Sequence, residues 1–130
     1  MQAMVVTAYG GPEALQFREV PEPTPGPRQV RIRVEATSVN FIDVLTRRGD
    51  EGYRRELPFV PGREASGVVD AVGADVTEFR VGQRVMALTA TGSYADMAVA
   101  DVSRTFPVPE GMDMALAGGL LMVGITAYNV

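Results

Sequence analysis

Short apolar segments alternate with polar residues along most of the chain, and turn-forming residues separate them. We expect β-strands at 1–9, 15–20, 29–38, 65–72, 84–88 and 93–100. The clearest pattern lies in 29–38, where Val30, Ile32 and Val34 share one face and charged or polar residues occupy the other. A period of two is typical of a strand with one face in the core and one in solvent. The alternate prolines of 21–27 predict an extended surface connector, because proline cannot donate a hydrogen bond to a sheet.

Two segments carry the signals of a helix. The segment 40–48 begins at Asn40, a candidate N-cap, has Asp43 in its first turn and is followed by Gly49. This arrangement favours a short helix with both ends satisfied. The largely uncharged segment 113–129 predicts a second, C-terminal helix.

The number and order of these elements indicate the fold class. Several short strands with one small helix, and no repeated βα unit, favour a mainly β protein built as a compact, partly open barrel. We therefore expect one domain at 1–112, followed by a helical segment at 113–130.

The composition removes several kinds of chemistry. The 130 residues include no His and no Cys, and all twelve basic residues are Arg. Imidazole bases, thiol nucleophiles, the common zinc sites and lysine Schiff bases are therefore excluded, and we expect no metal site. The net charge of −4 argues against a nucleic-acid partner, which needs a clustered basic face.

The two ends of the chain bear on its location. The N-terminus has no basic leader followed by a long apolar stretch, so we expect a cytoplasmic protein. The uncharged segment 114–130 falls just short of the about 18 residues that a membrane-spanning helix needs, and it contains three glycines. We therefore expect no membrane partner.

Three groups of polar residues are candidates for function, and each has a structural alternative. Asn40 and Asp43 can cap a helix or face a ligand cleft. Thr126 and Asn129 are three residues apart on one helix face, where the hydroxyl can bond back to the helix or both side chains can line a cleft. Tyr53 lies in a loop, where its hydroxyl can donate a hydrogen bond to a carbonyl group.

Longer motifs identify a family resemblance. The stretches SVNFIDVLTRRG, LPFVPGREASGVVDAVGADVTEFRVGQRVMAL, GSYADMAVA and GITAYNV occur in this order. Together they resemble the zinc-independent quinone oxidoreductases, the zeta-crystallin-like branch of the medium-chain dehydrogenase/reductase superfamily, over essentially the whole chain. The resemblance implies a GroES-like β-barrel at 1–112, the N-terminal catalytic half of an NADPH-dependent two-domain enzyme. It also implies that 113–130 begins the helix leading to a Rossmann domain, which is absent from these residues.

The resemblance implies roles for particular residues. It places six cofactor-binding residues beside the nicotinamide of NADPH or at the domain junction: Asn40, Phe41, Ile42, Asp43, Thr126 and Asn129. Some relatives carry a tyrosine where this chain has Leu45, which leaves Tyr53 as the candidate catalytic hydroxyl over the substrate carbonyl.

The motif PGREASG differs from its zinc-dependent counterpart. Arg63 stands where zinc-dependent alcohol dehydrogenases carry a histidine ligand, and a guanidinium has no lone pair for a metal. The resemblance implies that Glu64 makes a structural hydrogen bond or ion pair near the cleft. Whether Arg63 is its partner is left open, because adjacent residues on a strand point to opposite faces.

The resemblance implies hydride transfer from NADPH to a quinone or another α,β-unsaturated carbonyl. The 130-residue chain alone is expected to be inactive. The alternative is a stand-alone, non-catalytic GroES-like binding domain. In either case the apolar C-terminal segment predicts a homo-oligomer, such as a dimer.

Overall fold

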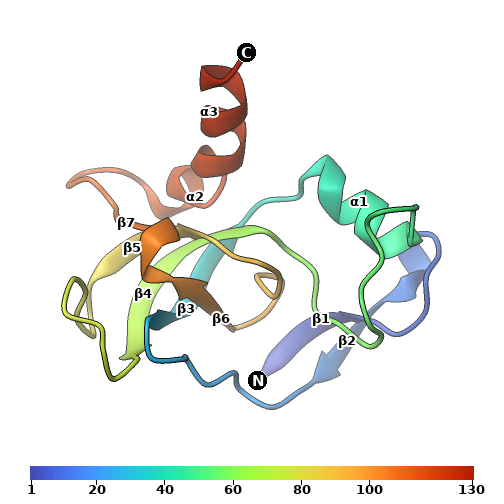
Figure 1. The fold of residues 1–130 in the computed structure, drawn as a ribbon, viewed down its shortest axis with the longest axis horizontal. Helices are drawn as coiled ribbons and strands as arrows, with labels where there is room; N and C mark the ends of the chain where they lie inside the picture. The colour runs from blue at the N-terminus through green and yellow to red at the C-terminus, as the bar shows by residue number, and fades with distance from the viewer.

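A computed structural model describes all residues, 1–130. The centre of the fold is one curled, antiparallel five-stranded sheet (Figure 1). Its strands, in spatial order, are β6 (Met97–Asp101), β3 (Gln29–Thr37), β4 (Glu64–Val72), β5 (Arg84–Leu88) and β7 (Thr105–Pro107). The mainly β fold predicted from the sequence is confirmed.

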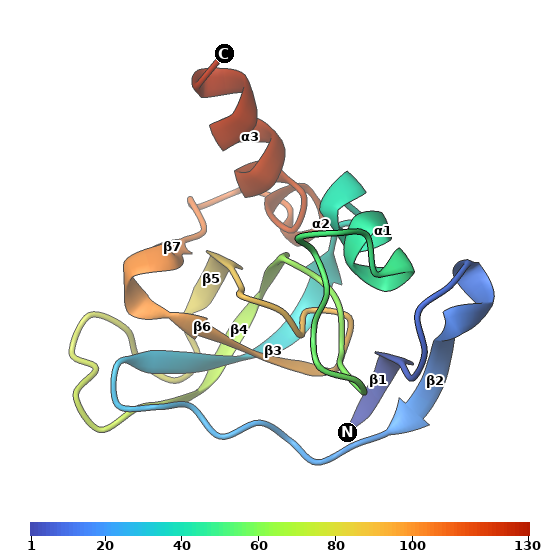
Figure 2. The same ribbon diagram turned by 45° about the vertical axis from the view of Figure 1, so that its right-hand side comes forward.

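A second, two-stranded sheet pairs β1 (Gln2–Val6) with β2 (Leu15–Glu19), and a 3₁₀ turn, η1 (Pro12–Ala14), connects them. Backbone hydrogen bonds join it to the rest of the domain, including one of 2.9 Å from the Met4 N–H to the Tyr94 carbonyl. The proline-rich connector then leads into β3, which crosses the molecule as the blue-to-cyan strand of Figure 2.

The core lies against the inner face of the larger sheet. Six buried residues form it: Val30, Ile32, Val69, Val85, Ala87 and Ala100. The alternation expected in β3 holds for Val30 and Ile32, which are fully buried, while Val34 is only half-buried. The register between β3 and β4 shifts beyond Val34, and a bulge of this kind bends a sheet toward a barrel.

Three helices lie at one end of the sheet (Figure 2): α1 (Phe41–Arg48), α2 (Met114–Ala117) and α3 (Leu120–Tyr128). The single C-terminal helix expected at 113–129 is interrupted at Gly118 and Gly119. Gly118 packs closely on β3, where a Cβ atom would lie 2.7 Å from the Ala36 Cβ. Only glycine allows this approach, and the chain changes direction there before α3 begins.

Several strand boundaries differ from the sequence prediction. β1 ends at Val6 rather than Tyr9, and β6 begins at Met97 because 93–96 forms a loop. β7 was not expected, since Pro107 indicated a break in the strand pattern. It pairs only with β5, so it is an edge strand, a position where proline is tolerated because no partner needs its N–H.

A further short 3₁₀ turn, η2 (Val102–Arg104), joins β6 to β7. No helix in the structure has the length and apolar character needed to cross a membrane.

Candidate functional site

The helix α1 is fixed at both ends by local interactions. Asn40 is its N-cap, and the Asp43 Oδ2 atom accepts a hydrogen bond of 2.9 Å from the Asn40 backbone N–H. Gly49 ends the helix with φ 74°, a left-handed conformation that glycine adopts without a steric penalty. The helix predicted for 40–48, with its capping residues, is confirmed.

Glu64, the first residue of β4, is a buried carboxylate with no cationic partner. It is 1% exposed, and the ion pairs of the structure all involve other residues. Its Oε1 atom accepts hydrogen bonds from the Ser38 hydroxyl and, at 3.1 Å, from the Asn40 amide. The expected structural hydrogen bond is therefore present, and the expected alternative of an ion pair is not formed.

The second carboxylate oxygen of Glu64 reaches α3. Its Oε2 atom accepts a hydrogen bond of 3.1 Å from the backbone N–H of Met122, in the first turn of that helix. The N-cap of α3 is Gly119, which has no side chain to accept such a bond. Glu64 thus places a negative charge at a helix N-terminus, where the helix dipole favours it, and connects β4, α1 and α3.

A cleft of about 370 Å³ lies between α1 and α3. Its lining is mainly apolar and consists of Asn40, Phe41, Ile42, Met122, Val123, Thr126 and Ala127. Four of the six residues expected to bind a cofactor therefore lie together, although Thr126 is more than 80 positions away from the other three in the sequence. The Thr126 hydroxyl donates to the Met122 carbonyl at 2.7 Å, the back-bonded arrangement considered in the sequence analysis.

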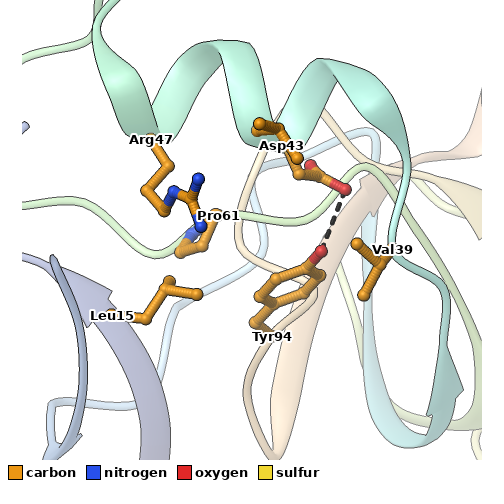
Figure 3. A pocket seen from close by; sticks show the side chains of 7 residues that line it. Leu15, Val39, Asp43, Arg47, Pro61 and Tyr94 are labelled. Atoms are coloured by element: carbon orange, nitrogen blue, oxygen red, sulfur yellow. Dashed lines mark hydrogen bonds between the residues drawn. The ribbon is translucent and has the colours of Figure 1, made fainter. Parts of the chain in front are cut away.

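Two expected cofactor residues lie outside this cleft. Asn129 is exposed at the C-terminal end of α3. Asp43 is buried and lines a smaller pocket of about 80 Å³ with Tyr94, Leu15 and Arg47 (Figure 3). Asp43 therefore connects α1 to the loop before β6.

Tyr94 and Asp43 form a buried polar contact in this small pocket. The Tyr94 hydroxyl donates to the Asp43 Oδ2 atom at 3.0 Å (Figure 3). Burial, and then the charge and hydrogen bond of Asp43, raise the pKa of the Tyr94 phenol. A tyrosine held in its neutral form by a carboxylate acts as a structural donor near neutral pH rather than as an acid.

Tyr53 lines a third cleft, of about 290 Å³, together with Ile42. It is 42% exposed, and its cleft is polar, with Thr46, Gly52, Arg54, Arg55 and Arg63 as further lining residues. Ile42 contributes to both clefts. The expected catalytic hydroxyl is therefore adjacent to the α1–α3 cleft but not inside it.

Arg63 lines the Tyr53 cleft and does not pair with Glu64. Burial, followed by the nearby positive charge of Arg55, lowers the pKa of the Arg63 guanidinium. Arg63 and Glu64 are therefore not partners. Arg63 lines the Tyr53 cleft, whereas Glu64 binds Asn40 and Met122 beside the α1–α3 cleft. No group of three or more residues with metal-binding side chains lies together in the structure.

Three groups that form hydrogen bonds in the site were not predicted from the sequence. Ser38 and the backbone N–H of Met122 bind Glu64 across the fold, and Tyr94 binds Asp43. A backbone N–H leaves no signal in a sequence. Ser38 and Tyr94 gave only weak signals. Ser38 is a hydroxyl residue two positions before a helix cap, and Tyr94 is an aromatic residue in a strand-like segment.

Comparison with known proteins shows which families and sequences the chain resembles. Residues 26–110 match the family model of the alcohol dehydrogenase GroES-like domain. The synaptic vesicle membrane protein VAT-1 homolog of Rattus norvegicus is 39% identical over 132 residues, covering 100% of this chain and 33% of that protein. A quinone oxidoreductase of Pseudomonas aeruginosa is 40% identical over 120 residues, covering 92% of this chain and 37% of that protein.

Two solved structures of proteins complexed with NADPH resemble this chain over nearly its whole length. The Escherichia coli quinone oxidoreductase complexed with NADPH matches with a TM-score of 0.93 and 28% identity over 98% of this chain and 39% of that one. A mycobacterial protein complexed with NADPH matches with a TM-score of 0.93 and 42% identity over 98% of this chain and 40% of that one. The chain thus spans about a third of the length of the curated relatives it matches.

Proposed function

Because the chain belongs to the alcohol dehydrogenase GroES-like domain family, we propose that it forms the substrate-side domain of an NADPH-dependent quinone or enone oxidoreductase. The quinone oxidoreductases among its relatives support an oxidoreductase of the medium-chain dehydrogenase/reductase superfamily. The conjugated carbonyl substrate, the use of NADPH and the independence from zinc are parts of the proposal.

The observation that carries the proposal is the cleft between α1 and α3. It joins Asn40, Phe41 and Ile42 from one helix to Thr126 from the other. Its volume and its apolar walls fit a flat, uncharged ring such as nicotinamide. When bound, NADPH would supply a hydride at this position.

The residues of the chain would bind and orient the reactants. Phe41, Ile42 and Val123 would exclude water from the ring, which strengthens every electrostatic interaction in the site. The Asn40 amide donates to Ser38 at 3.0 Å and to Glu64 at 3.1 Å, so its orientation is fixed before any ligand arrives. Pre-organisation of this kind reduces the entropic cost of binding.

Tyr53 would meet the charge that develops on the substrate oxygen. In the proposed mechanism its hydroxyl donates a hydrogen bond to the carbonyl oxygen as hydride is added, the role that a metal ion fills in zinc-dependent relatives of this fold. Its partial exposure, 42%, leaves the hydroxyl available to a ligand. Asp43 and Asn129 would act from outside the cleft, Asp43 by positioning α1.

The chain by itself is proposed to bind NADPH weakly. Its glycines do not form a loop with the dinucleotide-binding spacing before a helix, so these residues offer no cradle for the pyrophosphate. The test is the quinone-dependent oxidation of NADPH by the natural protein that contains this chain, compared with the 130-residue chain alone. Activity of the first and not of the second supports the proposal.

A second candidate function, a binding domain that assembles through its C-terminal segment, is favoured by one observation. The helix α3 and the residues around it expose large apolar side chains: Leu116, Val123, Ile125, Tyr128 and Val130. Exposed apolar side chains gathered on one short segment favour a surface that another protein surface covers. We propose a second copy of this chain as that partner, forming a dimer in a cytoplasmic setting without nucleic acid or membrane.

A further inference from the structure

Three arginines in the Tyr53 cleft have no carboxylate partner. The four ion pairs of the structure involve Arg28, Arg31 and Arg48, and none involves Arg54, Arg55 or Arg63, which line the cleft together. A chain with a net charge of −4 thus gathers unneutralised cations at one place.

Protein contacts hold two of these arginines in position. The Arg54 Nε atom donates to the Gly49 carbonyl at 2.8 Å, and its guanidinium lies over the Tyr9 ring, 5.6 Å from the centroid. The Arg55 Nη2 atom donates to the Ala90 carbonyl at 2.7 Å. Each contact uses a small part of a guanidinium that has five N–H donors, so donors remain for a ligand.

The electrostatic environment of Arg63 is unfavourable for a cation. Burial and then the charge of Arg55 lower the pKa of its guanidinium, Asp43 acts in the opposite direction, and Arg104 adds a smaller lowering effect. The Asp43 carboxylate already accepts hydrogen bonds from Tyr94 and from the Asn40 N–H. Arginine stays protonated in proteins, so this repulsion is relieved by an anion and not by loss of a proton.

We propose that the cleft formed by Tyr53, Arg54, Arg55 and Arg63 binds a small oxyanion, the carboxylate or phosphate group of a ligand. Planar guanidinium groups recognise both groups through paired hydrogen bonds. The volume of about 290 Å³ accommodates the anionic group with a small organic body.

The position of the cleft suggests what the oxyanion belongs to. Ile42 lines both this cleft and the α1–α3 cleft, so an anion here lies near the proposed nicotinamide position. The assignment of the oxyanion to the acidic end of the reducible substrate rests on the proposed function. The proposal that the cleft binds an oxyanion does not rest on the proposed function, because it is argued from the arginines alone.

Isothermal titration calorimetry of the 130-residue chain with inorganic phosphate and with benzoate tests the site. We expect saturable binding of at least one of them in low salt. Arg63→Gln should weaken it by at least about tenfold, a loss equal to about 1.4 kcal/mol. Arg80→Gln is the matched control, since Arg80 is exposed in the turn between β4 and β5 and has no side-chain partner; it removes the same charge and should change the affinity less than twofold.

The two anions identify the group that the cleft prefers, and tighter binding of either supports the site. If Arg63→Gln fails to fold, as judged by circular dichroism, Arg55→Gln is used instead and should weaken anion binding to the same extent. Absence of saturable binding for both anions, or equal weakening by Arg80→Gln, would overturn the proposal. The substrate assignment is tested separately: the natural protein should reduce a quinone carrying a carboxylate more efficiently than its neutral analogue, and this preference should disappear in Arg63→Gln while reduction of the neutral quinone persists.

Discussion

The carboxylate of Glu64 accepts a hydrogen bond of 3.1 Å from the backbone N–H of Met122. A buried strand residue thereby caps a helix that begins 56 positions later at Leu120. The same carboxylate accepts the Asn40 amide at 3.1 Å, so one side chain sets both walls of the α1–α3 cleft.

Replacement of Glu64 by Gln should destabilise the chain by about 1–3 kcal/mol. The substitution removes the charge at the α3 N-terminus and turns one acceptor into a donor among three half-buried donors. Urea denaturation followed by circular dichroism measures the change. Glu110→Gln is the control, because Glu110 is exposed and should alter stability by less than about 0.5 kcal/mol. Equal effects of the two substitutions would show that the buried contacts contribute nothing.

Two glycines near the C-terminus should respond oppositely to alanine. At Gly118 a new Cβ atom would lie 2.7 Å from the Ala36 Cβ, and we expect Gly118→Ala to cost about 1–3 kcal/mol through overpacking. At Gly124, inside α3, a Cβ atom meets nothing within 4 Å, and we expect a gain of about 0.5–1 kcal/mol. Thermal unfolding of both variants measures the difference. A stable Gly118→Ala variant would mean that α2 does not pack on β3 as described.

The alkaline titration of the chain should show one late tyrosine. Burial and Asp43 raise the pKa of Tyr94 above its ordinary value of 10.0, so its neutral form is favoured in the folded state. The corresponding stabilisation is fully present below pH about 10 and is lost as the pH rises beyond it. We expect ultraviolet titration to show a late-titrating tyrosine, and Tyr94→Phe to remove it. A Tyr94→Phe variant that still shows a late tyrosine would refute the assignment.

Much of the fold could be predicted from the sequence because its signals are local. The cap at Asn40, the stop at Gly49 and the alternation that starts at Val30 each lie within a few residues. The contacts of Glu64 could not be predicted, because they depend on which distant segments the sheet brings together. The interruption at Gly118 was missed for the same reason, since an apolar helical pattern continues across it and only the approach of Ala36 requires glycine.

Self-association should depend on the exposed face of α3. Val123 is 58% exposed there, and Val123→Glu would place a charge in the proposed dimer contact. Sedimentation equilibrium should show a concentration-dependent dimer for the unmodified chain and a monomer for Val123→Glu. Val81→Glu is the matched control, because Val81 is 61% exposed in the turn between β4 and β5, and it should leave the dimer intact. A strict monomer at high concentration for the unmodified chain would contradict the proposed assembly.

The Tyr53 hydroxyl should contribute to turnover and not to cofactor affinity. In the natural protein that contains this chain, Tyr53→Phe should lower kcat at least about tenfold through loss of a donor to the substrate oxygen, with the Kd for NADPH nearly unchanged. Tyr128→Phe serves as control, since Tyr128 is almost fully exposed at the end of α3. Unchanged turnover in Tyr53→Phe would remove this residue from the site.

The α1–α3 cleft is tested most directly by filling it. Ala127 lines the cleft, and Ala127→Trp in the natural protein would occupy the space proposed for nicotinamide, while Ala74→Trp adds the same side chain at an exposed turn. Quinone-dependent oxidation of NADPH, followed by absorbance, should fall more than about tenfold in Ala127→Trp and stay unchanged in Ala74→Trp. Full activity of Ala127→Trp, or no activity of the unmodified protein with any quinone or enone, would contradict the proposed function.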